Sequence, residues 1–164
     1  MFARIDRWLV RLTGAAVVLL MVAMTVSILL GVFYRYILNS ALTWPEELAR
    51  YAMVWVACLG SSLALRSGDH VAVEFLVQRV PSRARRWVIL GGRLLILVFL
   101  FLMVRYGSEM TARVSHQRSA AMELSMSVPY LAIPLGGTLM IYHLLVLMFR
   151  RKEERPHPLD LPAA

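Results

Sequence analysis

Residues 12–34 read LTGAAVVLLMVAMTVSILLGVFY, a run that contains no charged side chain. A helix needs about 20 mostly apolar residues to cross the roughly 30 Å hydrocarbon core of a bilayer, and this run is long enough. It also exceeds the roughly 7–15 apolar residues of a signal peptide, and no clear small-residue cleavage site follows it. The run therefore predicts a retained membrane-spanning helix.

Three further stretches have the same character, at residues 45–65, 87–107 and 124–149. The first is charged only in its opening turns, the second carries Arg93 and Arg105 toward its two ends, and the third is uncharged. A soluble helical domain would interleave polar residues with a helical period, whereas this chain is 59% hydrophobic and collects its charges in clusters. Because unpaired backbone groups are not tolerated in lipid, the predicted fold class is an all-α membrane protein with four transmembrane helices.

The distribution of basic residues predicts the orientation. Thirteen lie before the first span, around the loop between the second and third spans, or after the fourth, against five on the other side. Because basic loops remain in the cytoplasm, both termini are expected there. The same excess explains the net charge of +8 without nucleic-acid binding. The arginines expected to contact lipid headgroups are Arg35, Arg83, Arg85, Arg86, Arg93 and Arg105.

Residues 1–149 are expected to form a single membrane domain. The charged, proline-rich residues 150–164 are predicted to be a disordered cytoplasmic tail. Between the second and third spans, apolar residues at 71–80 are interspersed with polar ones before Pro81. This pattern favours a short amphipathic helix in the membrane interface, and the alternative is a partly ordered loop.

The sequence favours no catalytic, metal or cofactor function. Cys58 is the only cysteine, which excludes an intrachain disulfide and a multi-cysteine zinc site. His143 is the only histidine inside a span, so it lacks the second histidine that a membrane haem would need. No carboxylate lies near the middle of a span, where a proton or cation relay would usually place one. This absence argues against an independent transporter. The sequence also contains no nucleotide-binding loop and no nucleophile motif, so we expect no enzyme activity.

The start of the second span, residues 43–50 (TWPEELAR), is the most distinctive part of the chain. Thr43 and Glu46 have the spacing of a capping box. Glu46 and Glu47 precede Arg50 by four and three residues, within reach of an ion pair on a helix. A structural role explains every residue type here. The alternative is that Glu47 or Arg50 pairs with an opposite charge on another subunit.

A series of motifs follows one another along nearly the whole chain. They are Phe33, Arg35 and Tyr36; Trp44, Glu46, Glu47 and Arg50; Trp55, Leu59 and Gly60; Gly68 and His70; Pro81; and Pro134 with Gly136. In their order and spacing the chain resembles the small membrane subunit of tripartite ATP-independent periplasmic (TRAP) transporters. Val80 is a small departure, because leucine is expected before Pro81.

The resemblance implies a non-catalytic subunit of the bacterial inner membrane that scaffolds a large multi-span subunit. The large subunit would carry the substrate and sodium sites, and a periplasmic solute-binding protein would deliver a solute, often a carboxylate-bearing metabolite. The implied partner contacts are Trp44, Glu46, Glu47, Arg50, Trp55, Gly60 and His70. Two alternatives remain open: an independent small four-helix transporter, which should carry an acidic residue within a span, and a redox membrane anchor, which should bind haem.

Overall fold

The computed structural model describes residues 2–67 and 82–149, and most of them are helical. The helices are α1 (Phe2–Tyr36), α2 (Trp44–Ser67), α4 (Ser82–Arg113), α5 (Ser127–Tyr130) and α6 (Ala132–Phe149). Four stretches are long and apolar enough to cross a membrane, namely Asp6–Tyr36, Trp44–Arg66, Trp87–Arg113 and Ser127–Leu147. The prediction of an all-α protein with four spans is confirmed.

The beginning of the fourth span differs from the sequence prediction. Residues 124–126 belong to a loop, and helix starts only at Ser127, with a break at Leu131 between α5 and α6. Proline explains the break, because Pro134 has no N–H to donate to the preceding turn. Pro134 itself lies in the first turn of α6, where a missing donor costs little.

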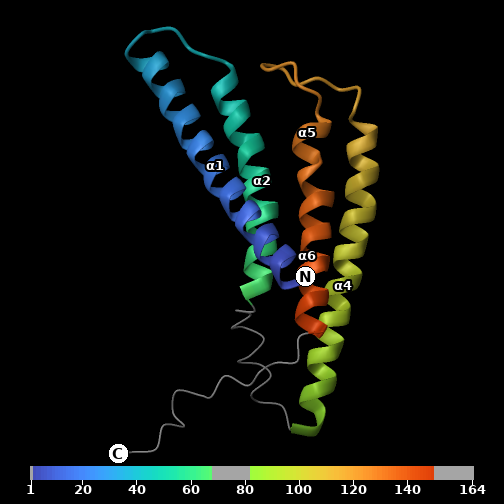
Figure 1. The fold of residues 1–164 in the computed structure, drawn as a ribbon. Coiled ribbons are helices and arrows are strands. Elements are labelled where there is room, and N and C mark those ends of the chain that lie inside the picture. The colour runs from blue at the N-terminus through green and yellow to red at the C-terminus, as the bar shows by residue number, and fades with distance from the viewer. Residues whose placement is uncertain (1, 68–81, 150–164) are drawn as a thin grey trace, which may run out of the picture.

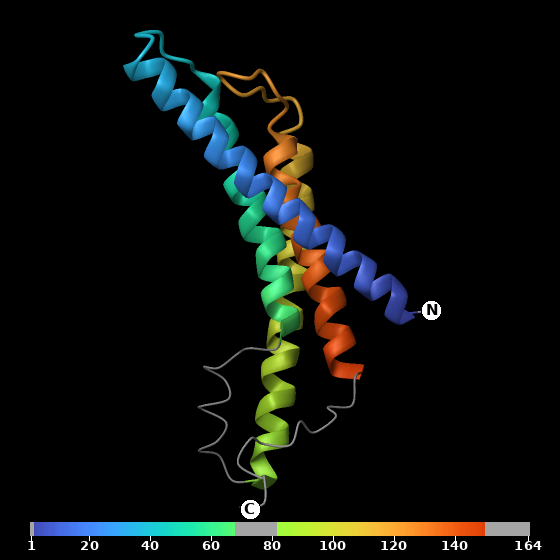
Figure 2. The ribbon, with the colours of Figure 1, turned by 60° about the vertical axis from the view of Figure 1, so that its left-hand side comes forward.

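The long helices lie in a row in the order α1, α2, α6, α4, so that α2 packs against α1 on one side and α6 on the other (Figure 1). Helix α1 crosses α2 obliquely (Figure 2). A row has two broad faces and little interior. Within the most apolar part of each span, only 6% of residues are buried in the first and third spans, against 28% in the second and fourth. Lipid or another protein must therefore cover most of the apolar surface.

Glycines allow the closest approaches between helices of the row. A Cβ atom on Gly136 would lie 2.7 Å from that of Cys58 on α2, and one on Gly137 would lie 2.7 Å from the side chain of Val104 on α4. Helix α6 thus approaches both neighbours at distances that a side chain would prevent. A Cβ atom on Gly60 would meet nothing within 4 Å, so the packing of the described helices does not require this glycine.

The two ends of the row have different chemistry. We call one the Trp44 end, which carries the loops of residues 37–43 and 114–126, and the other the Asp6 end, where α1 begins and α2 ends (Figure 1). His70, the interfacial helix predicted at residues 71–80 and the tail predicted at residues 150–164 lie outside the described residues. The cytoplasmic placement of both termini stays a prediction.

Candidate functional site

At the Trp44 end, Glu47 binds the chain's own loop. Its Oε2 accepts hydrogen bonds from the backbone N–H groups of Ala121 at 2.9 Å and Met122 at 3.0 Å. Its Oε1 accepts a short hydrogen bond from the hydroxyl of Tyr51, one turn further along α2. A single carboxylate therefore fastens the loop of residues 114–126 to the first turns of α2.

Two aromatic residues extend this contact along the same face of α2. The Tyr51 hydroxyl also contacts the sulfur of Met126 at 3.4 Å, and Trp55 donates from Nε1 to the carbonyl of Val128 at 3.2 Å. Residues four apart on a helix share one face, so positions 47, 51 and 55 form a line. We call Glu47, Tyr51 and Trp55 the clamp, because together they hold the loop and the start of α5 against α2.

The clamped loop also has internal contacts. Arg118 and Ser125 form an isolated antiparallel bridge, and the Arg118 guanidinium donates to the carbonyl of Glu123 at 3.0 Å. Glu123 has a φ of 53°, in the left-handed region that costs an L-residue roughly 1–2 kcal/mol. The surrounding hydrogen bonds hold it there. Arg118 and Glu123 thus help to shape the loop.

The ion pairs predicted for Arg50 do not form. Glu46 pairs instead with Arg35 of α1 at 3.6 Å, and Glu47 is engaged by the loop. An exposed pair at this helical spacing contributes only about 0.2–0.5 kcal/mol, so other partners displace it easily. Arg50 is exposed and joins no ion pair in the described part of the chain. The capping box is also absent there, since the hydroxyl of Thr43 makes no hydrogen bond within residues 2–67 and 82–149.

Arg50 instead lies at an apolar cavity of about 330 Å³ between α2, α5 and α6. The other residues that line the cavity are Tyr51, Val54, Met126, Pro129, Tyr130 and Ile133. An exposed cation beside an apolar hollow can accept a side chain with an apolar body and an acidic end. Among the implied partner contacts that the structure describes, which leave out His70, Arg50 is therefore the one whose charge remains available. Trp44 is half-buried at the start of α2.

A polar cluster at the Asp6 end was not predicted. Arg66 of α2 donates to Oδ2 of Asp6 on α1 at 2.7 Å, and the Asp6 side chain is only 7% exposed, against 24% for Arg66. His143 of α6 is 1% exposed beside them. Both His143 ring nitrogens and Asp6 Oδ1 lack a hydrogen-bond partner among the described residues. The sign of this cluster in the sequence is Asp6 itself, a single acid among the basic residues that precede the first span.

The arginines expected at lipid headgroups occupy varied surroundings. Arg93 is half-buried, and Arg105 is exposed and pairs with Glu109 at 3.2 Å. Arg83, Arg85 and Arg86 belong to the first turns of α4. Contact with headgroups stays a prediction for all of them and for Arg35.

Comparison with known proteins identifies relatives over most of the chain. It is 33% identical over 120 residues to the C4-dicarboxylate TRAP transporter small permease protein DctQ of Rhodobacter capsulatus, which covers 71% of this chain and 53% of that protein. It is 32% identical over 108 residues to the sialic acid TRAP transporter permease protein SiaT of Haemophilus influenzae, covering 66% of this chain and 18% of the relative. It is 26% identical over 115 residues to the sialic acid TRAP transporter small permease protein SiaQ of Vibrio cholerae, covering 70% and 66%.

The chain thus spans about half of the Rhodobacter relative, about two thirds of SiaQ and less than a fifth of SiaT. A family model, that of the DctQ component of the tripartite ATP-independent periplasmic transporters, matches residues 24–153. This match covers most of the chain and confirms the resemblance seen in the sequence. The family consists of transporter components and not of enzymes, as the sequence predicted. The chain belongs to the DctQ component family of the tripartite ATP-independent periplasmic transporters.

Proposed function

We propose that the chain is the small membrane subunit of a TRAP-type secondary transporter and serves as a scaffold for a large membrane subunit. The observation that carries this proposal is the row of helices with two broad apolar faces. An independent transporter would need polar groups enclosed between helices along the depth of the membrane. The clamp and the Asp6 cluster instead occupy the two ends of α2 and tie its neighbours to it.

The relative SiaT supports association with a larger membrane protein. A segment similar to this chain makes up 18% of SiaT, so the counterpart of this chain is joined there to a much longer remainder within one polypeptide. We infer that this chain makes the corresponding contact non-covalently, with a separate large subunit. Such a contact also provides a cover for part of the exposed apolar surface of the row.

We assign the contact to Arg50 and its cavity and to Gly60. Arg50 is exposed, and a Cβ atom on Gly60 would meet nothing within 4 Å, so both positions are free to meet another chain. Glu47 and Trp55 act indirectly in this proposal, because they shape the neighbouring surface through the clamp. Trp44, Glu46 and His70 remain candidates for contact with a partner.

For the solute we propose an organic acid, since the relatives named above are C4-dicarboxylate and sialic acid transport proteins. The family resemblance supports three further parts of the proposal. A periplasmic binding protein delivers the solute at the Trp44 end, transport is coupled to sodium, and the large subunit carries the solute and sodium sites. In this proposal the chain lies in the bacterial inner membrane. The Trp44 end faces the periplasm, and the Asp6 end and both termini face the cytoplasm.

The test is co-purification followed by uptake. The tagged chain, extracted gently from native membranes, is expected to bring down a large polytopic protein in near-equal amount. Arg50→Ala should reduce that recovery and the sodium-dependent uptake of the solute, whereas Arg113→Ala, at an exposed arginine on α4 at the same end, should not. Uptake by a homo-oligomer without a partner would instead establish an independent transporter, and a haem Soret band would establish a redox anchor.

A further inference from the structure

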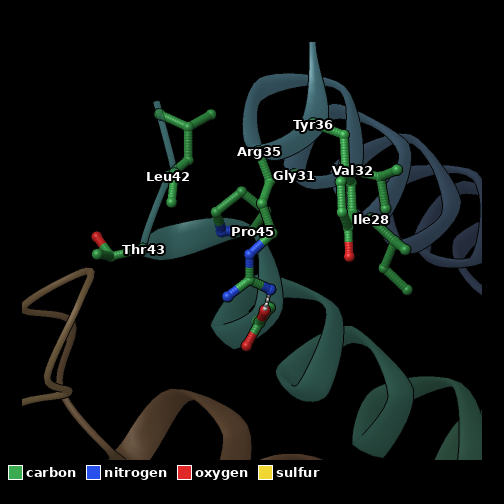
Figure 3. Close-up of a pocket in the computed structure, with 10 residues that line it drawn as sticks. Ile28, Gly31, Val32, Arg35, Tyr36, Leu42, Thr43 and Pro45 are labelled. Atoms are coloured by element: carbon green, nitrogen blue, oxygen red, sulfur yellow. Dashed lines mark ion pairs between the residues drawn. The ribbon is translucent and has the colours of Figure 1, made fainter. Parts of the chain in front are cut away.

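A groove at the Trp44 end separates the last turns of α1 from the start of α2. Its cavity volume is about 440 Å³, within the roughly 300–1,000 Å³ of small-molecule sites. At its base the two helices touch, since a Cβ atom on Gly31 would lie 3.3 Å from that of Pro45. Ile28 and Val32 supply an apolar wall on α1, and Leu42 closes the other side (Figure 3). We call this site the α1–α2 groove.

The mouth of the α1–α2 groove carries one cation and one anion. The Arg35 guanidinium on α1 pairs with the Glu46 carboxylate on α2 at 3.6 Å. Figure 3 shows the Arg35 side chain extending from α1 toward the start of α2. The two side chains are 60% and 74% exposed, and exposed pairs of this kind are weak. A ligand that satisfies both charges can therefore separate them at little cost.

The α1–α2 groove lies where the spans meet the edge of the membrane. The first span ends at Tyr36 and the second begins at Trp44, and aromatic residues of these types are typical of the headgroup region. Ile28 precedes Arg35 by seven residues, or about 10 Å along a helix. The charged mouth is thus level with headgroups, while the apolar wall extends into the hydrocarbon.

We propose that the α1–α2 groove binds one phospholipid whose headgroup bears both a phosphate and a primary ammonium, as in phosphatidylethanolamine. The phosphate lies on Arg35, whose planar guanidinium forms paired hydrogen bonds with phosphate oxygens. The ammonium donates to Glu46, and one acyl chain follows Ile28 and Val32. The proposal requires only that the chain spans a membrane and does not depend on its role in transport.

The pair of charges distinguishes between headgroups. A choline headgroup has a quaternary nitrogen with no N–H to donate to Glu46. An anionic glycerol headgroup provides a phosphate for Arg35 but leaves the Glu46 carboxylate next to added negative charge. A primary ammonium satisfies both residues at once.

The experiment is native mass spectrometry of the full chain, with any partner it retains. The protein is exchanged into nanodiscs of equal phosphatidylethanolamine, phosphatidylcholine and phosphatidylglycerol before release. Phosphatidylethanolamine is expected to remain bound in preference to the other two. Arg35→Gln should lower its retention by about tenfold, as loss of a charged hydrogen-bonded pair implies. Val32→Phe, which fills the groove without changing a charge, should have a similar effect.

Two further variants test the assignment. Glu46→Gln should abolish the preference for phosphatidylethanolamine over phosphatidylglycerol, because it removes the acceptor for the ammonium. Arg105→Gln is the matched control, since Arg105 lies on α4, away from the α1–α2 groove, is 63% exposed and pairs with Glu109 of the same helix. Equal retention in Arg35→Gln, Val32→Phe and the parent would refute the site, as would an equal loss in Arg105→Gln. Cross-linking of a Val32→Cys variant to a protein instead of a lipid would also overturn the proposal.

Discussion

Replacing Arg66 with methionine should destabilise the protein more than replacing its partner Asp6 with leucine. The two side chains form one ion pair at 2.7 Å, but their surroundings differ. Arg66→Met strands a short carboxylate that is only 7% exposed. Removing one partner of a buried pair costs about 3–5 kcal/mol.

Asp6→Leu leaves a less costly residue behind. The Arg66 side chain is already 24% exposed and long enough to extend its charge toward water. The expected loss is therefore closer to that of one charged hydrogen bond, about 1.5–3 kcal/mol. The double variant Asp6→Leu/Arg66→Met leaves no stranded charge, and replacing a buried ion pair with apolar residues is often neutral or stabilising. The double variant should therefore be more stable than Arg66→Met alone.

Reversible unfolding of the purified chain in mixed micelles, titrated with dodecyl sulfate and followed by circular dichroism and tryptophan fluorescence, measures these differences. Arg66→Lys, which keeps the charge, should lose little stability. Arg113→Met should also change little, because its pair with Glu109 is exposed although its 2.6 Å separation is as short. Equal losses in the two single variants would refute the argument from burial. A double variant as unstable as Arg66→Met would show that the stranded charge is not the cause.

Two other predictions concern the clamp and the close helix contacts. Glu47→Gln should speed hydrogen exchange at the backbone N–H groups of Ala121 and Met122, because the neutral glutamine side chain accepts weaker hydrogen bonds than the carboxylate. Unchanged exchange at these two groups would rule out a role for Glu47 in ordering the loop. Gly136→Ala should lower the free energy of unfolding by roughly 1–3 kcal/mol, and with it the unfolding midpoint, since the added methyl group would overlap α2. Gly60→Ala, with open space around it, should leave the midpoint of the isolated chain unchanged, and an equal loss in both glycine variants would contradict the packing described here.

The number and position of the spans could be predicted from the sequence because each depends only on the length of an apolar run. The contacts of Glu47 could not, since its two backbone donors are 74 and 75 residues away along the chain. Every residue except proline has such a donor, so no side-chain pattern marks the partner. Local spacing pointed instead to Arg50, the nearest opposite charge.

The pair between Asp6 and Arg66 was missed for a related reason. Its members are 60 residues apart, and Arg66 is one of the thirteen basic residues that the sequence assigns to the cytoplasmic side. His143 is the only histidine inside a predicted span, and nothing in the sequence links it to Asp6 or Arg66. Only the packing of α1 and α6 on either side of α2 brings the three together. The single acid in the segment before the first span is visible in the sequence, but the sequence does not identify Arg66 as its partner.

Contacts at the two ends and at the middle of α2 determine how the row is aligned. In a bilayer, apolar packing alone gives helices little preference for one register, because lipid tails are as apolar as leucine. The Asp6–Arg66 pair holds α1 at one end, the clamp holds the loop of residues 114–126 at the other, and Gly136 fits α6 against Cys58 between them.

A variant that breaks any of these three contacts should let a helix slide along α2 and so disturb a partner that it never touches. Loss of co-purification in Arg66→Met would therefore not identify Arg66 as a contact residue. Only a variant that leaves the unfolding midpoint unchanged, as expected for Arg50→Ala and Gly60→Ala, can locate the surface that meets the large subunit.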